Sequence, residues 1–179
     1  IVGIRAAFAR CGLTDVRGTT HAGDEARLVR DAIDDGIDTL VVAGGDGTWS
    51  KCAVPLARAG SPARMALLAA GTGNDFAKNL GIDPRDPRAL AERLADGGVR
   101  ERRVDLGRVD DTWFLNVAGF GFDVAVLHAS LKHRVLRGAA VYVVSALQEL
   151  FRFPGLPIGV DGAPPQEHLL AVFSNGTHF

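Results

Sequence analysis

The chain has 179 residues, of which 47% are hydrophobic and 23% are charged, and its net charge at neutral pH is −1. This composition is that of a globular protein with one good core or two small ones, and the near-neutral charge gives no reason to expect a nucleic-acid partner. Two distant cysteines without a CxxC motif and five histidines without ligand spacing favour a cytoplasmic protein with reduced thiols and no zinc site.

Helix and strand patterns alternate over the first hundred residues, which predicts an α/β domain. The predictions rest on apolar periodicity, on capping residues and on glycine stops. In chain order, the predicted elements are a helix between Asp24 and Gly36, a strand at 40–43, a helix at 48–59, a strand at 65–70, a short helix-like segment at 76–80 and a helix between Asp86 and Gly97. Pro55 lies inside the second helix, where it removes one hydrogen bond or kinks the helix.

Short strand patterns take over after Val99. Four strands are predicted, with turns at 110–111 and 161–162, and the strands cover residues 104–109, 113–117, 156–160 and 169–173. Apolar residues at helical spacing predict a helix at 142–153, and we assign them to core packing in preference to a membrane-facing lip. We place a domain boundary near Glu101, which gives an α/β domain at 1–101 and the beginning of a β-rich domain at 102–179.

Two glycine-rich loops directly follow the two buried strands of the α/β domain. The first loop is Gly44-Gly45-Asp46-Gly47-Thr48, and the second is Gly71-Thr72-Gly73-Asn74-Asp75. Glycine adopts positive φ and lets a ligand approach the main chain, so successive N–H groups can converge on phosphate oxygens. Because open α/β sheets bind ligands where their strands end, the pair of loops predicts one phosphate site. Neither loop fits the P-loop or the G-x-G-x-x-G pattern.

The order of these motifs resembles the catalytic domain of the diacylglycerol kinase and sphingosine kinase family, in its bacterial lipid kinase branch. The resemblance runs from about Thr19 to the end of the chain, and it is carried by GGDGT, GTGNDFA, Val104-Asp105-Leu106-Gly107 and the stretch from Asn116 to Asp123. GGDGT alone also occurs in NAD kinases and phosphofructokinase-like proteins, where GTGNDFA is not expected. The resemblance implies a nucleotide-binding α/β domain followed by part of a β-rich sandwich domain.

The resemblance also implies transfer of the γ-phosphate of ATP to a lipid hydroxyl, with Mg²⁺. Asp46 is the expected catalytic carboxylate, which orders a network of Mg²⁺ and water or accepts the lipid proton. Asp75 and Asp105 match positions that extend this metal network, and the structural alternatives for them are a helix N-cap and a strand-end acceptor. The expected ATP-binding residues are Thr19, Gly44, Gly45, Asp46, Gly47, Thr48, Gly71, Thr72, Gly73 and Asn74.

The expected partner is a lipid alcohol at the membrane surface, met by a cytoplasmic, peripheral protein, and the formation of a homodimer stays open. No stretch approaches 18 consecutive apolar residues, and the N-terminus lacks the signal-peptide pattern. Lys51 stands where the family often has Glu, and Ala69 where it often has Pro, which leaves the substrate lipid open. The alternatives are a soluble nucleotide kinase of the NAD kinase type and a non-catalytic nucleotide-binding module.

We expect the chain to be a fragment of a longer protein. It begins without the opening strand and N-P-x-S-G turn of this family, and it stops at Ser174-Asn175-Gly176, where the family's β domain is half built. The acids that the bacterial branch uses as proton acceptor and for one metal would lie in a later part. Residues 1–179 alone are therefore expected to bind ATP weakly at best and to phosphorylate no lipid, which a comparison with the full-length protein would test.

Overall fold

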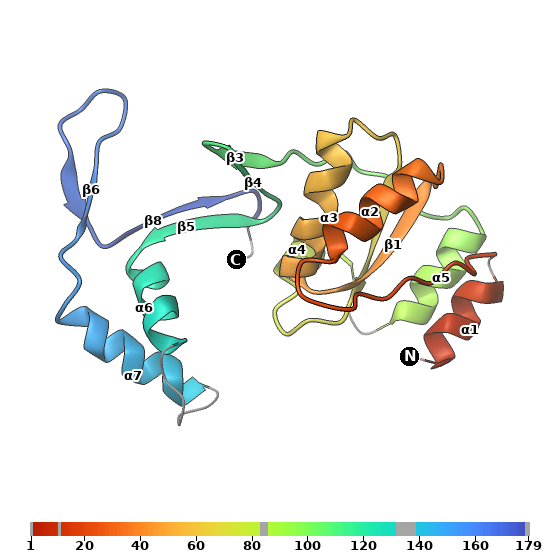
Figure 1. Ribbon diagram of the computed structural model, residues 1–179, viewed down its shortest axis with the longest axis horizontal. Helices are drawn as coiled ribbons and strands as arrows, with labels where there is room; N and C mark the ends of the chain where they lie inside the picture. The colour runs from red at the N-terminus through yellow and green to blue at the C-terminus, as the bar shows by residue number, and fades with distance from the viewer. Residues whose placement is uncertain (1, 11, 83–85, 132–138, 178–179) are drawn as a thin grey trace. The chain divides into compact units, whose positions relative to one another are not determined.

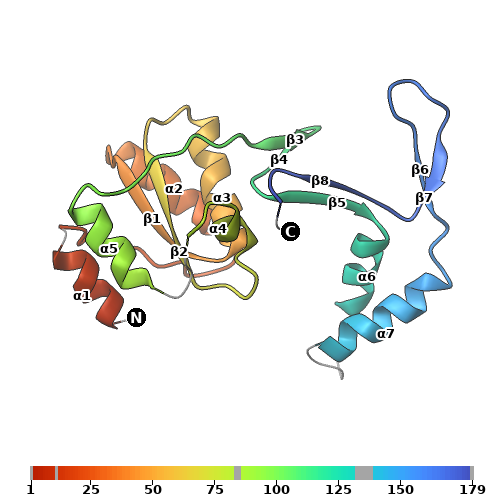
Figure 2. The same cartoon turned by 180° about the vertical axis from the view of Figure 1, so that it is seen from behind.

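The computed structural model describes residues 2–10, 12–82, 86–131 and 139–177. Contacts within the chain divide it into two compact units, residues 1–116 with 174–179, and residues 117–173. Figures 1 and 2 show the ribbon from two opposite sides. The chain passes from the first unit to the second after Asn116, and the functional boundary expected near Glu101 stays a prediction.

The first unit is built on two parallel strands, β1 (Thr39–Gly44) and β2 (Arg64–Ala69), which pair along their full length. Side chains along a strand point alternately to its two faces. Val42 accordingly enters one hydrophobic core and Val41 the other. Burial of both faces explains why the two strands are near-continuous apolar runs in the sequence.

Helices cover both faces of these strands (Figure 1). The helices α2 (Glu25–Asp34) and α3 (Asp46–Arg58) lie on the side of Val42, and α1 (Val2–Arg10) and α5 (Pro87–Ala95) lie on the other. The α3 helix begins two residues before its predicted start. It runs through Pro55 to its end, so the hydrogen bond that proline removes does not terminate the helix.

Trp49 fixes α3 onto β1. Its side chain is completely buried, and its Nε1 donates a hydrogen bond to the Val42 carbonyl at 3.2 Å. The neighbouring Cys52 is also buried, and this burial raises the pKa of its thiol to about 11. The thiol is therefore protonated at neutral pH, in agreement with a reduced, unreactive cysteine. Cys11 lies outside the described residues.

The predicted hairpin is present at the end of the first unit. Strand β3 (Gly107–Val109) pairs antiparallel with β4 (Thr112–Phe114) across the turn at 110–111. The strand predicted at 113–117 is wrong as one element, because the chain bends at Leu115 and Asn116. Leu115 is buried in the first core, so its apolar character reflects packing inside a bend.

In its described residues, the second unit combines two strand pairs with two helices. Strand β5 (Val117–Gly121) pairs with β8 (Leu170–Ser174), and β6 (Leu156–Ile158) pairs antiparallel with β7 (Gln166–His168). Its helices, α6 (Phe122–Ser130) and α7 (Ala139–Leu150), pack against each other. The sequence did not predict α6 or β7.

The assignment of the apolar residues at 142–153 to core packing is wrong for one side of α7. Five of these side chains are between 53% and 87% exposed, namely Tyr142, Val143, Leu147, Leu150 and Phe151. Periodicity identifies the helix but not the side that its neighbour covers. Within the described ranges, no helix is both long enough and apolar enough to span a bilayer.

Candidate functional site

The two glycine loops lie side by side at the carboxyl ends of β1 and β2. Because the strands are parallel and Gly44 pairs with Ala69, both strands end at the same edge. The Ala70 N–H donates to the Gly44 carbonyl at 2.8 Å, and a Cβ placed on Gly71 would lie 2.6 Å from the Cα of Gly45. The backbones of the two loops are therefore in direct contact, and the structure joins the two motifs into one site.

Glycine is required in these loops because of close packing. A Cβ on Gly44 would lie 2.6 Å from the Thr48 Cβ, and one on Gly45 would lie 3.0 Å from the Gly71 Cα. The positive φ expected for these glycines is wrong, since the positive φ in this region belongs to Asn74 and Gly45 has a φ of −114°. A Cβ on Gly47 would have no described atom within 4 Å, so the backbone there is open to a ligand.

Asp46 connects the first loop to the second. It is the first residue of α3, yet its carboxylate accepts hydrogen bonds from the backbone of another helix, α4 (Asp75–Asn79). Oδ2 accepts from the Asp75 N–H at 3.1 Å, and Oδ1 from the Phe76 N–H at 2.8 Å. The first N–H groups of a helix lack partners within the helix and favour a negative charge. The Asp46 carboxylate therefore caps α4 and clamps the loops together.

Asp75 lies beside Asp46. The position that a Cβ on Gly73 would take is 3.0 Å from Asp75 Oδ2 and 3.5 Å from Asp46 Oδ2, so both oxygens border the same small space. Asp75 Oδ1 pairs with Lys78 at 2.7 Å. Mg²⁺ in phosphoryl-transfer enzymes is held by one or two carboxylates together with phosphate and water oxygens. The Asp46 and Asp75 pair fits such an ion.

Among the described residues, Asp105 forms no metal-binding cluster with Asp46 and Asp75. Its side chain is exposed, and its backbone carbonyl accepts a hydrogen bond from Asn175 Nδ2. In the part of the chain that the structure describes, no three or more His, Cys, Asp or Glu side chains gather as a metal site. The metal-binding roles of Asp75 and Asp105 stay predictions.

The Asn74 side chain forms hydrogen bonds across the second loop. It adopts the left-handed conformation at φ 53°, which asparagine tolerates better than most residues. Its Oδ1 accepts from the Gly71 N–H at 3.0 Å, and its Nδ2 donates to the Gly71 carbonyl at 2.7 Å. The side chain, predicted to bind ATP, is thus already engaged with Gly71, whereas Thr72 and Gly73 are exposed on the loop surface.

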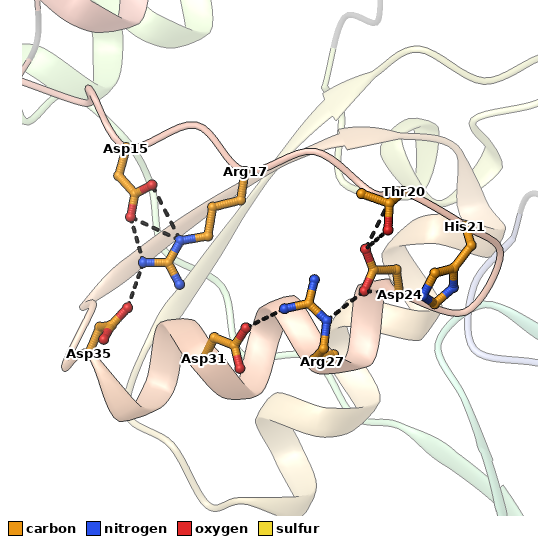
Figure 3. A network of polar contacts seen from close by, with 8 residues as sticks. All are labelled: Asp15, Arg17, Thr20, His21, Asp24, Arg27, Asp31 and Asp35. Carbon is orange, nitrogen blue, oxygen red and sulfur yellow. Dashed lines mark hydrogen bonds and ion pairs between the residues drawn. The ribbon is translucent and has the colours of Figure 1, made fainter.

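The loop that carries Thr19 is held by a buried acid at the start of α2 (Figure 3). Thr19 itself is exposed, while the next residue, Thr20, donates from its N–H at 3.0 Å and from its hydroxyl at 3.1 Å to Asp24 Oδ2. Arg27 Nε donates to the other oxygen at 2.7 Å. The sequence identifies Asp24 as the start of this helix but did not predict that its carboxylate holds the preceding loop.

The same figure shows a second, exposed anchor for this segment. Arg17 Nη2 lies 2.6 Å from a carboxylate oxygen of Asp15 and 2.6 Å from one of Asp35, which follows α2. Such exposed pairs contribute little free energy. They nevertheless align the segment before Thr19 along α2.

Asp24→Asn is expected to lower the thermal stability by several degrees, because it removes a buried charge that Arg27 and Thr20 stabilise. These two partners hold the pKa of Asp24 well below its usual range. The folded state therefore keeps the charge while the unfolded chain takes up a proton near pH 4. The stabilisation is complete above that pH and is lost as the pH falls further.

Urea unfolding at pH 7 and pH 3 measures this effect. The wild type should lose stability between the two pH values by more than the Asp24→Asn variant does. Asp31→Asn is the matched control, since Asp31 pairs with the same Arg27 at 2.7 Å from an exposed position. Equal stability of wild type and Asp24→Asn at pH 7 would contradict this anchoring role.

Lys51 is paired with an acidic residue of α2. Its Nζ lies 3.5 Å from Glu25 Oε1, in an exposed pair between α3 and α2. An open groove of about 620 Å³ runs along these two helices, and it contains none of the predicted ATP-binding residues. Its lining is formed by Gly23, Ala26, Arg30, Ser50, Lys51, Val54, Pro55, Arg58, Ala59 and Trp113.

Comparison with known proteins shows that this chain is similar to proteins named as kinases. Residues 2–109 match the family model of the diacylglycerol kinase catalytic domain. A relative in Pseudomonas putida, "Probable lipid kinase YegS-like", is 39% identical over 150 residues, which are 83% of this chain and 49% of that protein. "Diacylglycerol kinase" of Mycobacterium tuberculosis is 35% identical over 147 residues, which are 79% and 46%. The chain spans about half the length of the curated relatives it matches.

Solved structures confirm the expected fold class. A diacylglycerol kinase from Bacillus anthracis superposes with a TM-score of 0.64 at 25% identity, covering 98% of this chain and 57% of that one. A further structure from the same organism gives a TM-score of 0.69 at 20% identity, covering 99% and 62%, and supports the fold alone. An α/β domain of the nucleotide-binding type is followed by a part rich in strands. Since the family model matches more than half of the residues of this chain, the chain belongs to the diacylglycerol kinase catalytic-domain family.

Proposed function

We propose that the protein is an ATP-dependent lipid kinase that transfers the γ-phosphate of ATP to the hydroxyl of a lipid such as diacylglycerol. The observation that carries this proposal is the contact between Gly45 and Gly71, which joins two glycine loops at the end of two parallel strands. Asp46 and Asp75 border the same space. Such a combination supplies backbone donors for phosphates and carboxylates for a cation.

The chemistry requires positioning and charge neutralisation more than covalent help. The backbone N–H groups of Gly47 and Thr48 belong to the first turn of the 13-residue helix α3, where they have no acceptor one turn earlier in the helix. They would donate to phosphate oxygens of ATP, with the positive end of the helix dipole behind them. The open space around Gly47 leaves room for that approach.

Mg²⁺ bound with ATP would neutralise charge on the transferring phosphate. Asp46 and Asp75 are the residues that would hold it. Each carboxylate oxygen has two acceptor positions, so the bonds from the Asp75 and Phe76 N–H groups leave Asp46 further capacity. A fixed Asp46 would also be able to accept the proton of a lipid hydroxyl within reach.

A lipid acceptor is favoured over a dinucleotide by the relatives, whose names are those of lipid and diacylglycerol kinases. Such an acceptor lies in a bilayer, so the proposal includes a peripheral protein at the cytoplasmic membrane surface. The substrate would be a long-chain alcohol, and diacylglycerol, phosphatidylglycerol, ceramide and isoprenoid alcohols all offer a suitable hydroxyl.

The test is transfer of label from γ-³²P-ATP by the full-length protein, with Mg²⁺. Each of these four lipid classes is offered in turn in mixed micelles, and NAD is offered in a parallel reaction. We expect label in the organic extract of at least one lipid and none in NAD. Label in NAD alone, or ATP binding without transfer to any acceptor, would contradict the proposal.

A further inference from the structure

Helix α7 of the second unit carries its large apolar side chains on the outside. The row formed by Val141 and Ser145 is buried, with 8% and 0% exposure, and α7 packs against α6. Figure 1 shows the two helices as neighbours at one end of this unit. We call the five exposed side chains the α7 stripe, and they are Tyr142, Val143, Leu147, Leu150 and Phe151.

Helix geometry places the α7 stripe on one side. Successive residues of a helix are rotated by about 100° about its axis. The stripe residues within α7 therefore lie on the side of the helix opposite to Val141 and Ser145. Phe151, directly after the helix, is 87% exposed and continues the stripe. A helix in a globular protein has its apolar side inward and its polar side outward. In α7 the buried side holds a serine and the exposed side holds no charged residue, and such a patch marks an interaction surface.

The sequence around the α7 stripe is basic. From Leu127 to Phe153 the only acidic residue is Glu149, whereas the basic ones are Lys132, Arg134, Arg137 and Arg152. Glu149 is half-buried and lies outside the stripe, and Arg152 is exposed just beyond the helix. An exposed helix side with large apolar side chains and a tyrosine, in a stretch of sequence rich in cations, has the composition of a helix that binds an anionic membrane interface.

We propose that the α7 stripe is the surface by which the protein docks on an anionic lipid bilayer, with α7 lying in the plane of the interface. This inference rests on the proposed function, because a kinase for lipid alcohols has to reach an acceptor held in the bilayer. The exposed Leu131, at the end of α6, adds apolar surface to the same pair of helices.

The first test is vesicle co-sedimentation of the full-length protein with Leu147→Glu. Leu147 is 56% exposed, so the variant should melt at the wild-type temperature. On vesicles of equal phosphatidylglycerol and phosphatidylcholine, its binding should fall by about tenfold, because an apolar anchor is replaced by a repelled charge. Val160→Glu is the matched control, since Val160 is 63% exposed in the segment after β6 and should not alter binding.

The second test places a probe in the stripe without removing apolar surface. In the Phe151→Trp variant, vesicles that contain brominated phosphatidylglycerol should quench more fluorescence than they quench in the wild type, because neither Trp49 nor Trp113 of this chain lies in the stripe. This result would show that the stripe enters the bilayer. Vesicle binding without added quenching would overturn the proposal.

If something other than a bilayer covers the stripe, the same variants give different results. If Leu147→Glu halves the mass in solution while vesicle binding persists, the stripe is an interface with a second copy. If the variant melts several degrees lower with vesicle binding intact, another segment of the protein covers the stripe. Either result overturns the docking proposal. If vesicle binding depends on the stripe but no lipid is phosphorylated by the wild type, the docking surface stands and the proposed function fails.

Discussion

Asp46→Asn is expected to reduce phosphate transfer by about 10³-fold or more, because it removes a negative charge placed to organise the metal ion and the acceptor hydroxyl. The asparagine side chain has one acceptor oxygen and one NH₂ group, so it can keep only one of the two bonds to the α4 backbone. Some loss of stability is therefore expected together with the catalytic loss. Transfer rates at saturating ATP and a melting curve of the same preparation measure the two effects.

A matched control separates capping from catalysis. Asp86 accepts a hydrogen bond from the Ala89 N–H at 2.9 Å and caps α5, so Asp86→Ala removes a helix cap outside the glycine loops. This control should keep its transfer rate. If the folded Asp46→Asn variant retained transfer within about tenfold of the wild type, Asp46 would be an α4 cap alone, contrary to its proposed role.

Gly71→Ala is expected to abolish measurable ATP binding and to lower stability, because its Cβ would lie 2.6 Å from the Gly45 Cα and 2.9 Å from Asn74 Oδ1. Neither neighbour is the free end of a flexible side chain, so the loops have to separate. Overpacking of this kind costs about 1–3 kcal/mol, and it moves the N–H groups of both loops away from a shared ligand. Isothermal titration with ATP and Mg²⁺, together with urea unfolding, measures both effects.

Gly47→Ala is the informative comparison for this variant. In α3 the new methyl group would enter open space, and alanine is a better helix former than glycine. The fold should therefore be unchanged or slightly stabilised, and any weakening of ATP binding would report a blocked approach to the backbone. Wild-type stability and wild-type ATP affinity in Gly71→Ala would show that the loop contact is not needed.

The location of the site could be predicted from sequence because its signals are local. Glycines directly after apolar runs mark the ends of strands, and parallel strands end at a shared edge. The partners within the site could not be predicted in this way. That Asp46 caps α4, or that Gly45 touches Gly71, depends on the pairing of β1 with β2, which brings together residues some 30 positions apart.

The errors in the second unit have a similar origin. Apolar periodicity reports which residues are hydrophobic but not which of them a neighbour covers, so the pattern alone favours a core position for the α7 stripe. The pattern also misses helix α6, because Gly119 and Gly121 precede it and are typical of a loop. Gly121 has a φ of 104° directly before α6, so the chain turns into the helix at this glycine.

Amide hydrogen exchange of the full-length protein, with and without ATP and Mg²⁺, tests most directly whether the two glycine loops form one nucleotide site. The proposed site predicts slower amide exchange in residues 44–50 and 70–76 together when ATP and Mg²⁺ are added. Both loops would contact the same phosphates, which protects their N–H groups. Unchanged exchange in both loops at saturating ATP, or protection confined to the groove between α2 and α3, would contradict it.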